Sequence, residues 1–153
     1  MLRKSVWVVA GCLAAVAVTA HAKEEASEAE KAVEYRKAVF AAMGYNAKPI
    51  AGMVKGKIAW DGDEVAERAR RLEALAGMPW EGFMEGTADV GHSETKAAAW
   101  DKRDEFRDLA EKLQERTAAL VDAAESGGRS AMAESFKKVG KTCKSCHDDF
   151  KED

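Results

Sequence analysis

The chain has 153 residues, which suits one domain of ordinary size and leaves little room for a second. Hydrophobic residues make up 46% of it and only 2 residues are proline, a balance that favours helices and excludes a collagen-like or disordered chain. The formal net charge of −3 argues against a nucleic-acid-binding protein, because such proteins usually carry a basic excess. Three cysteines are too few for a small domain built on disulfides.

The N-terminal residues have the organisation of a secretory signal peptide. Arg3 and Lys4 precede an almost wholly apolar run over positions 5–18, and Ala20-His21-Ala22 supplies the small residues of a cleavage site. The apolar run is too short for a membrane-spanning helix, which needs about 20 residues. We therefore predict a signal peptide over 1–22 that is removed on export to the periplasm, with no membrane anchor.

Lipidation at Cys12 is the alternative for this N-terminal segment. The tetrapeptide Val9-Ala10-Gly11-Cys12 resembles a lipobox, but Cys12 lies in the middle of the apolar run and not at its end. Removal of the signal peptide leaves residues 23–153 as a single acidic domain, in which Cys143 and Cys146 are the remaining cysteines.

The first predicted helix begins near Ser27, which forms a capping box with Glu30. Apolar residues then recur at spacings of three and four, so that they share one helical face. Gly44 and Pro49 interrupt the pattern, and we expect them to kink or break this helix before it resumes for one or two turns.

Two further helical segments flank a long connection. One begins at Asp61, a favourable N-cap residue, and stops at Gly77. The glycine-rich connection over 77–92 is long for a compact domain, and we expect it to be functional or packed over another element. The next helix is predicted to open at Ser93 and to end at the Ser-Gly-Gly sequence of 126–128.

The last segment has the most regular pattern of the chain. Its apolar residues alternate spacings of four and three: Met132, Phe136, Val139, Cys143, Cys146 and Phe150. The sequence shows no alternating strand pattern and no repeat of solenoid length. Four amphipathic helices joined by short or medium connections predict an all-α fold, an antiparallel four-helix bundle.

The sequence Cys143-Lys144-Ser145-Cys146-His147 has the Cys-x-x-Cys-His spacing that attaches c-type haem. Two cysteines three residues apart share one face of a helix, and each thiol is able to add across one haem vinyl group to form a thioether. The imidazole of His147 then offers a nitrogen to the iron. Covalent attachment takes place outside the cytoplasm, which agrees with the predicted signal peptide.

Other chemistry for these cysteines fits less well. A structural zinc site needs four ligands, and His92, the second histidine after the signal peptide, lies in the glycine-rich connection. A thioredoxin-like redox pair follows a strand, whereas this motif lies inside a helix near the chain end. A disulfide across three residues would close a very small loop and stabilise little.

The motif on the last helix of a four-helix bundle resembles the cytochrome c′ family. Further segments support the resemblance, which covers essentially the whole chain after the signal peptide: Ala32-Val33-Glu34-Tyr35-Arg36, Met53-Val54-Lys55-Gly56, Gly77-Met78-Pro79-Trp80, Trp100 and Phe136. The resemblance implies one covalently attached haem c, with the iron bound by His147 on one side.

The resemblance also suggests what occupies the other side of the iron. In low-spin relatives a methionine of the first helix fills the sixth position, and the matching residue here is Phe40, whose phenyl ring cannot bind iron. This implies five-coordinate, high-spin iron behind a crowded apolar side chain. Met43 is expected to fill the core, and His92 to be exposed to solvent.

Several polar residues are candidate haem contacts. Arg36 lies on the apolar stripe of the first helix and requires an anionic partner, for which haem propionates are suitable, unless its guanidinium reaches water instead. Lys37 and the segment containing Thr95 and Lys96 resemble family haem contacts, and the free N–H groups of a helix start there suit a propionate. Family members often carry Arg where Lys151 stands, and lysine lacks its planar fork.

These expectations favour a haem protein that binds nitric oxide or carbon monoxide, and electron transfer is a second role compatible with gas binding. The alternative is a six-coordinate, low-spin electron-transfer cytochrome of the same fold. An enzymatic role is not expected, because no acid–base residue can be placed beside Phe40. The resemblance further implies a homodimer through the first two helices, whose surplus apolar residues include Val39, Ile50, Ile58 and Trp60.

Overall fold

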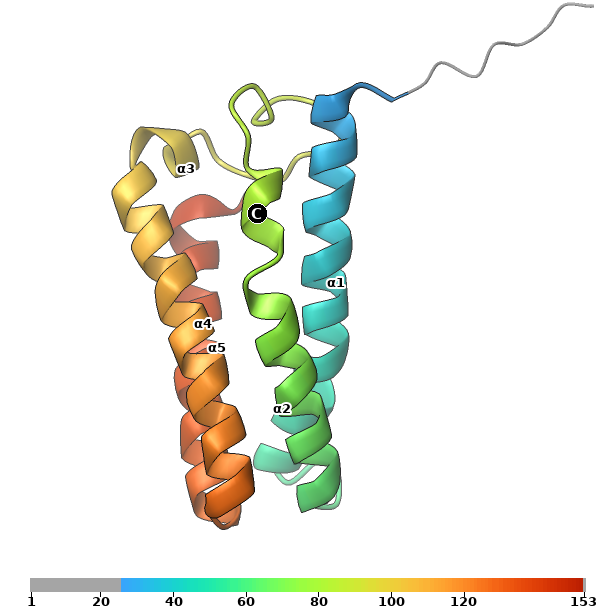
Figure 1. Cartoon of the computed structure of the whole chain (residues 1–153), viewed down its shortest axis with the longest axis vertical. Helices are drawn as coiled ribbons and strands as arrows, with labels where there is room; N and C mark the ends of the chain where they lie inside the picture. The colour runs from blue at the N-terminus through green and yellow to red at the C-terminus, as the bar shows by residue number, and fades with distance from the viewer. Residues whose placement is uncertain (1–25, 153) are drawn as a thin grey trace, which may run out of the picture.

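The computed structural model describes residues 26–152, so the predicted signal peptide, its cleavage site and Cys12 lie outside the described residues. Four long helices are arranged antiparallel, each running in the opposite direction to the one before it in the chain (Figure 1). The helical elements are α1 Glu28–Val54, α2 Gly62–Ala76, the 3-10 helix η1 Pro79–Gly82, the short α3 Ala98–Asp101, α4 Arg103–Ser126 and α5 Arg129–Phe150. The predicted all-α four-helix bundle is confirmed.

Side chains cap both of the first two helices as predicted. The Ser27 hydroxyl accepts from the Glu30 backbone N–H at 3.2 Å, and the Glu30 carboxylate accepts from the Ser27 N–H at 2.8 Å. Asp61 accepts from the Glu64 N–H at 3.0 Å at the start of α2. These bonds fix where α1 and α2 begin, and therefore which residues face the interior.

A mainly aliphatic cluster of buried side chains from all four long helices, the aliphatic core, holds the bundle together. Its most deeply buried side chains come from three helices: Ile50 and Met53 of α1, Val65 and Leu72 of α2, and Leu120 of α4. Met43 belongs to the same cluster, which confirms its expected role as a core residue. A side chain of this kind stabilises the fold by about 1.5–3 kcal/mol when it is fully buried.

Of the kink or break predicted at Gly44 and Pro49, the break is wrong, because α1 runs without interruption from Glu28 to Val54. Proline lacks the N–H that would bond the carbonyl four residues earlier, which here belongs to Tyr45. The Arg68 guanidinium of α2 donates to that Tyr45 carbonyl at 3.5 Å. Tertiary contact with α2 thus offsets part of the cost of the proline, and Ile50 stays fully buried.

The prediction that a helix opens at Ser93 is also wrong. Residues 94–96 are extended and form an isolated antiparallel bridge, Thr95 to Lys151, with the chain end. The Lys96 N–H donates to the Phe150 carbonyl at 2.9 Å, and the Glu152 N–H donates to the Glu94 carbonyl at 2.8 Å. These bonds satisfy the backbone outside a helix, so that α4 begins only at Arg103 after the single turn of α3.

The apolar residues taken as a dimer surface are mostly internal. Val39 and Ile50 are 7% and 0% exposed and belong to the aliphatic core. Trp60 is half-buried against the same core, whereas Ile58 is 50% exposed. Of these four residues, only Ile58 is therefore available as apolar surface for a dimer interface. The homodimer stays a prediction. Within residues 26–152 no helix combines the length and the apolar character required to cross a bilayer.

Candidate functional site

A cavity of about 310 Å³ lies between α1 and α5 near the end of the bundle where the chain terminates. It brings together six of the residues predicted from the sequence: Arg36, Lys37, Phe40, Thr95, Cys146 and His147. Its other lining residues are Ala41, Phe83, Glu94, Phe106, Phe150 and Lys151. A volume in this range is typical of a site for a small molecule or cofactor.

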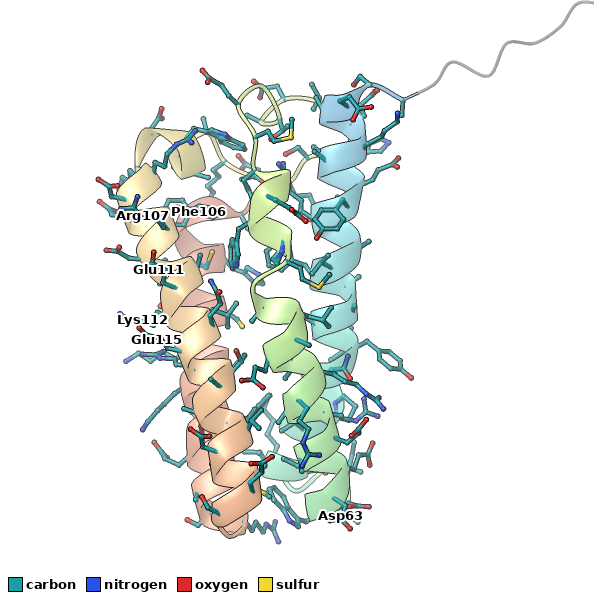
Figure 2. All side chains as sticks on the ribbon, viewed as in Figure 1. Asp63, Phe106, Arg107, Glu111, Lys112 and Glu115 are labelled. Carbon is teal, nitrogen blue, oxygen red and sulfur yellow. The ribbon has the colours of Figure 1, made fainter. Side chains whose placement is uncertain are left out.

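The cavity has a polar mouth and an aromatic interior. The lining residues exposed to solvent are Lys37, Ala41, Glu94, His147 and Lys151, and they mark where it opens. The deeper wall consists of rings in edge or tilted contact, with centroids 4.8 Å apart for Phe83 and Phe106 and 5.2 Å apart for Phe106 and Phe150. Figure 2 shows Phe106 on α4 at the cavity end of that helix.

Phe40 occupies the α1 side of this wall. Its ring centroid lies 5.8 Å from that of Trp80 and 6.2 Å from that of Phe83, both in edge geometry. Trp80 is held in turn by a hydrogen bond of 2.6 Å from its indole N–H to the Ala76 carbonyl at the end of α2. The connection over 77–92 thus folds inward as predicted, and it supplies the rings that position Phe40.

Phe83 and Phe106 line the cavity and were not predicted as site residues. Phe106 reads as an ordinary member of the apolar stripe of α4, and Phe83 lies in an irregular segment, where periodicity gives no information. The sequence signal that could have indicated Phe83 as a site residue is the density of aromatic residues after Pro79.

The two cysteines lie one turn apart on α5 in different surroundings. Cys146 lines the cavity, whereas Cys143 packs against the aliphatic core. No disulfide joins them. Burial raises the pKa of both thiols, to about 11 for Cys146, where the charges of Cys143 and Asp149 add to the effect.

His147 follows Cys146 at the mouth of the cavity. Partial burial of the ring lowers its pKa, and the nearby Lys151 ammonium lowers it further, against the smaller opposing effect of Asp148. The imidazole is thus favoured in its neutral form, in which a ring nitrogen holds a free lone pair for a metal. The His147 carbonyl accepts from the Lys151 N–H at 3.1 Å, which keeps the residue within the last turn of α5.

Arg36 is 2% exposed, so its guanidinium does not reach bulk water. Its Nη1 donates to the Gly82 carbonyl at 2.7 Å and to the Thr87 hydroxyl at 2.8 Å. Its Nη2 donates to the Thr87 carbonyl and the Ser93 hydroxyl, at 2.9 and 2.8 Å. The carbon centre of the guanidinium lies 4.4 Å from the centre of the Phe83 ring. These bonds hold the connection over 82–95 against α1.

All of these partners of Arg36 are neutral. Among residues 26–152 no carboxylate forms an ion pair with it, and burial lowers its pKa. A buried cation without an anionic partner is costly. Its position in the lining of the cavity fits a cofactor that carries its own carboxylates.

The remaining predicted contacts differ in their placement. The Thr95 hydroxyl lies 3.3 Å from Arg36 Nη2 and lines the cavity. Lys37 donates to the His92 carbonyl at 2.7 Å at the mouth, and the side chain of His92 is exposed as expected. Lys96 does not line the cavity, because its ammonium donates to the Asp148 carbonyl at 3.1 Å. The helix start that was expected to offer free N–H groups near Thr95 is absent, since this segment is extended.

Residues 94–96, paired with the chain end at Lys151, form a short strap at the mouth of the cavity beside His147. Glu94 lies 3.0 Å from the Lys151 ammonium and 3.9 Å from that of Lys37, so it joins the end of α5 to α1. The two positive charges hold the pKa of Glu94 below its usual value, with the hydrogen bond from Lys151 as the main cause. Lys151 is therefore engaged by Glu94 at the mouth of the cavity.

The residues around the cavity fit haem c in chemistry. An apolar aromatic wall suits the faces of a porphyrin, two reduced thiols suit thioether attachment, and a neutral imidazole suits an iron ligand. Arg36, whose partners within residues 26–152 are all neutral, suits a propionate. Within residues 26–152 no group of three or more His, Cys, Asp or Glu side chains is placed to hold a metal ion.

A four-helix bundle with Cys-x-x-Cys-His on its last helix, beside an apolar cavity, defines the class of c-type cytochromes built on helical bundles. The family model described as Cytochrome C′ matches residues 31–151. The chain belongs to the cytochrome c′ family. Proteins of this family carry covalently bound haem c and are periplasmic.

Individual relatives agree with this assignment. The cytochrome c′ of Halomonas halodenitrificans is 39% identical over 130 residues, which cover 82% of this chain and 98% of the relative. The structure of cytochrome c′ from Shewanella frigidimarina matches with a TM-score of 0.80 and 36% identity, covering 84% of this chain and 100% of that one. The structure of a nitric oxide complex of a leucine-to-alanine variant of cytochrome c′ from Alcaligenes xylosoxidans matches with a TM-score of 0.75 and 26% identity. The match covers 84% of this chain and 99% of that one.

Proposed function

We propose that this cytochrome holds haem c through Cys143 and Cys146, uses His147 as the axial ligand, and binds nitric oxide or carbon monoxide at the other axial position. The bound haem supplies an iron with one open coordination site. The proposal rests on which side chains of α1 line the cavity. Phe40 and Ala41 line the cavity there, and neither has an atom that binds iron.

The side chains that offer a sixth ligand are engaged elsewhere. Met43 is buried in the aliphatic core and is not part of the cavity lining. His92 is exposed and also lies outside the lining. The Lys37 ammonium donates to the His92 carbonyl. An apolar wall without a competing ligand favours small neutral gases over anions, which lose hydration on entering it.

Arg36, Lys37 and Thr95 are proposed to orient the cofactor through its propionates. Arg36 supplies a buried charge, and the loop bonds fix its direction. Lys37 and Thr95 add donors at the mouth. Lys96 is the weakest of the predicted contacts, because its ammonium already bonds the Asp148 carbonyl.

The test is the spectrum of the purified holoprotein followed by gas titration. Absorbance and EPR are expected to show high-spin, five-coordinate iron. Nitric oxide and carbon monoxide should change the absorbance of the reduced protein, whereas cyanide should bind the oxidised protein weakly. Low-spin iron with methionine ligation would overturn the gas-binding proposal in favour of the electron-transfer alternative.

The attachment residues have their own test. Cys143→Ala and Cys146→Ala should each leave one thioether bond and lower the yield of holoprotein, as measured by the pyridine haemochrome spectrum. Ser145→Ala, inside the same motif, is the control and should leave two bonds. Two thioether bonds in either cysteine variant would refute the assignment.

Export and assembly complete the proposal. Mass spectrometry of protein from the periplasmic fraction should show a chain that begins after Ala22, with no lipid on Cys12. Sedimentation at micromolar concentration should give the mass of a dimer. A monomer mass would refute the dimer without affecting the haem site.

A further inference from the structure

The connection between α2 and α3 accepts hydrogen bonds from both terminal nitrogens of the Arg36 guanidinium. Nη1 donates to the Gly82 carbonyl and the Thr87 hydroxyl, and Nη2 donates to the Thr87 carbonyl and the Ser93 hydroxyl. Each terminal nitrogen carries two hydrogens, so these four acceptors occupy all of them. The Thr95 hydroxyl, 3.3 Å from Nη2, adds only a longer contact. The terminal nitrogens are thus filled by groups of the protein.

One donor of Arg36, the Nε–H, bonds no group within residues 26–152. It is not sealed inside the protein, because Asn46 Oδ1 is the only sealed side-chain polar atom without a partner in this part of the chain. Arg36 is 2% exposed and lines the cavity, so the cavity is the space from which a bound group reaches this donor. The guanidinium therefore offers a cofactor one N–H, and not the two parallel N–H groups of a bidentate contact.

Thr87 contributes more bonds to this arrangement than any other partner of Arg36. It is 0% exposed, does not line the cavity, and accepts from Arg36 with both its hydroxyl and its carbonyl. Its hydroxyl also donates to the Met84 carbonyl at 2.7 Å, so it acts as donor and acceptor at once. Gly86 precedes it with a φ of 79°, a left-handed conformation that favours glycine, and the Thr87 N–H closes the turn on the Met84 carbonyl at 3.3 Å. This turn fixes the direction of Thr87.

We propose that Thr87 is a positioning residue, which holds the Arg36 guanidinium so that its Nε–H donates to a propionate of the bound haem. The Phe83 ring, whose centre lies 4.4 Å from the guanidinium carbon, limits movement of the group on one face. Without the Thr87 hydroxyl, one Nη1 hydrogen loses its acceptor in a buried place, so the guanidinium should leave its position. The proposal rests on the proposed propionate contact of Arg36 and adds the residue that directs it.

Resonance Raman spectroscopy of the reduced holoprotein tests this role, because the propionate-bending band rises in frequency as hydrogen bonds to the propionate strengthen. Thr87→Val removes the hydroxyl and keeps the carbonyl, and it should move the band to lower frequency. Thr87→Ser keeps the hydroxyl and should leave the band in place. An unmoved band in Thr87→Val would overturn the proposal. A move to higher frequency would also overturn it, because Thr87 would then hold Arg36 away from the propionate.

Thr117→Val is the matched control for the loss of a buried hydroxyl. Thr117 is also 0% exposed, but its hydroxyl bonds only the Leu113 and Gln114 carbonyls of its own helix α4. Thermal unfolding should show a loss of stability in this variant, whereas its propionate band should match that of the unaltered protein. Equal band shifts in Thr117→Val and Thr87→Val would indicate a general loosening of the bundle and would overturn the proposal.

Arg36→Lys separates this role from the propionate contact on which it rests. Lysine keeps the charge but lacks the Nε–H and the planar fork, so the band should move if Arg36 bonds a propionate at all. A band unmoved in Arg36→Lys would overturn the propionate contact, and the role of Thr87 with it. A band that moves in Arg36→Lys but not in Thr87→Val would overturn only the role of Thr87. The comparison of Thr87→Val with Thr117→Val decides that role even if Arg36→Lys yields no holoprotein.

Discussion

The two apolar clusters of this bundle differ in how completely the chain covers them. The aliphatic core around Ile50, Leu72 and Leu120 is almost fully buried by other side chains. The aromatic cluster around Phe106 and Phe150 includes half-buried rings such as Phe83, and it borders a cavity. The first cluster is complete in itself, whereas the second leaves apolar surface that a flat cofactor would cover.

This difference explains how one short chain combines stability with a binding site. Close packing of interdigitated side chains stabilises the aliphatic core and holds the helices in register. Rings that meet edge to face keep their positions while one side of each stays open to the cavity. The aliphatic core thus holds the helices together beside a cavity that residues of α1 and α5 line.

The largest expected effect is that of removing the attachment altogether. Cys143→Ala/Cys146→Ala should abolish covalent haem binding and leave the aromatic cluster without its cover. Amide hydrogen exchange should accelerate for the residues around Phe83 and Phe150, and less for those around Leu72. Mass spectrometry measures both the loss of haem and the exchange. Uniform acceleration in both clusters would show that the aliphatic core is not complete in itself.

A substitution in the aliphatic core is expected to have the next largest effect. Leu72→Ala should lower the free energy of unfolding by about 3 kcal/mol, because it leaves a cavity among fully buried side chains. Leu75→Ala is the matched control, since Leu75 lies in the same helix but is only partly buried. Denaturant unfolding of the two holoproteins should show the smaller loss for Leu75. Equal losses would contradict the comparison between the two positions.

These clusters also show how far the sequence alone predicts the molecule. Helical periodicity and caps predicted the bundle, because the aliphatic stripes and the Ser27 and Asp61 caps are local signals. The same local signals did not predict that α1 continues through Pro49 or that residues 94–96 are extended. At these two places Arg68 and the chain end supply bonds from distant parts of the sequence. Long-range partners of this kind leave no local pattern.

The site divides in the same way. The spacing of Cys143, Cys146 and His147 is a local motif and points directly to haem. The neutral loop partners of Arg36 and the roles of Phe83 and Phe106 depend on how the 77–95 segment folds against α1 and α4. A glycine-rich connection has no periodicity from which that fold could be inferred.

Substitutions of Phe40 and Met43 test where the aliphatic core ends and the cavity begins. Phe40→Ala should cost less than the 3 kcal/mol or so expected for Leu72→Ala, because Phe40 is half-buried beside a cavity. It should also speed carbon monoxide association, measured by stopped-flow absorbance, if its ring stands over the iron. Phe40→Met supplies a thioether and should shift the iron toward low spin at the expense of gas binding.

Met43→Ala is the control for this border, since Met43 lies one turn further along α1 in the aliphatic core. It should cost more stability than Phe40→Ala and leave the carbon monoxide association rate unchanged. An unchanged rate in Phe40→Ala would remove Phe40 from its proposed place while leaving the assignment of His147 intact.

The smallest effect is expected at the strap of residues 94–96 at the mouth of the cavity. Glu94 pairs with Lys151 and Lys37, which lowers its pKa, so its ionised form stabilises the folded state. This contribution is fully present above the ordinary glutamate pKa of about 4.3 and disappears as the pH falls through the lowered pKa. Glu94→Gln should therefore be slightly less stable than the unaltered protein at pH 7 and equally stable in acid, with the difference reduced by salt.

Hydrogen exchange distinguishes the strap from an ordinary surface ion pair. Glu94→Gln should speed exchange of the Lys96 and Glu152 amides, whose bonds to Phe150 and Glu94 form the bridge. Glu134→Gln removes an exposed pair with Lys137 inside one turn of α5, which joins no separate segments, and should leave those amides unchanged. If both variants exchange like the unaltered protein, the backbone bonds alone hold the strap, and Glu94 contributes only to the charge at the mouth of the cavity.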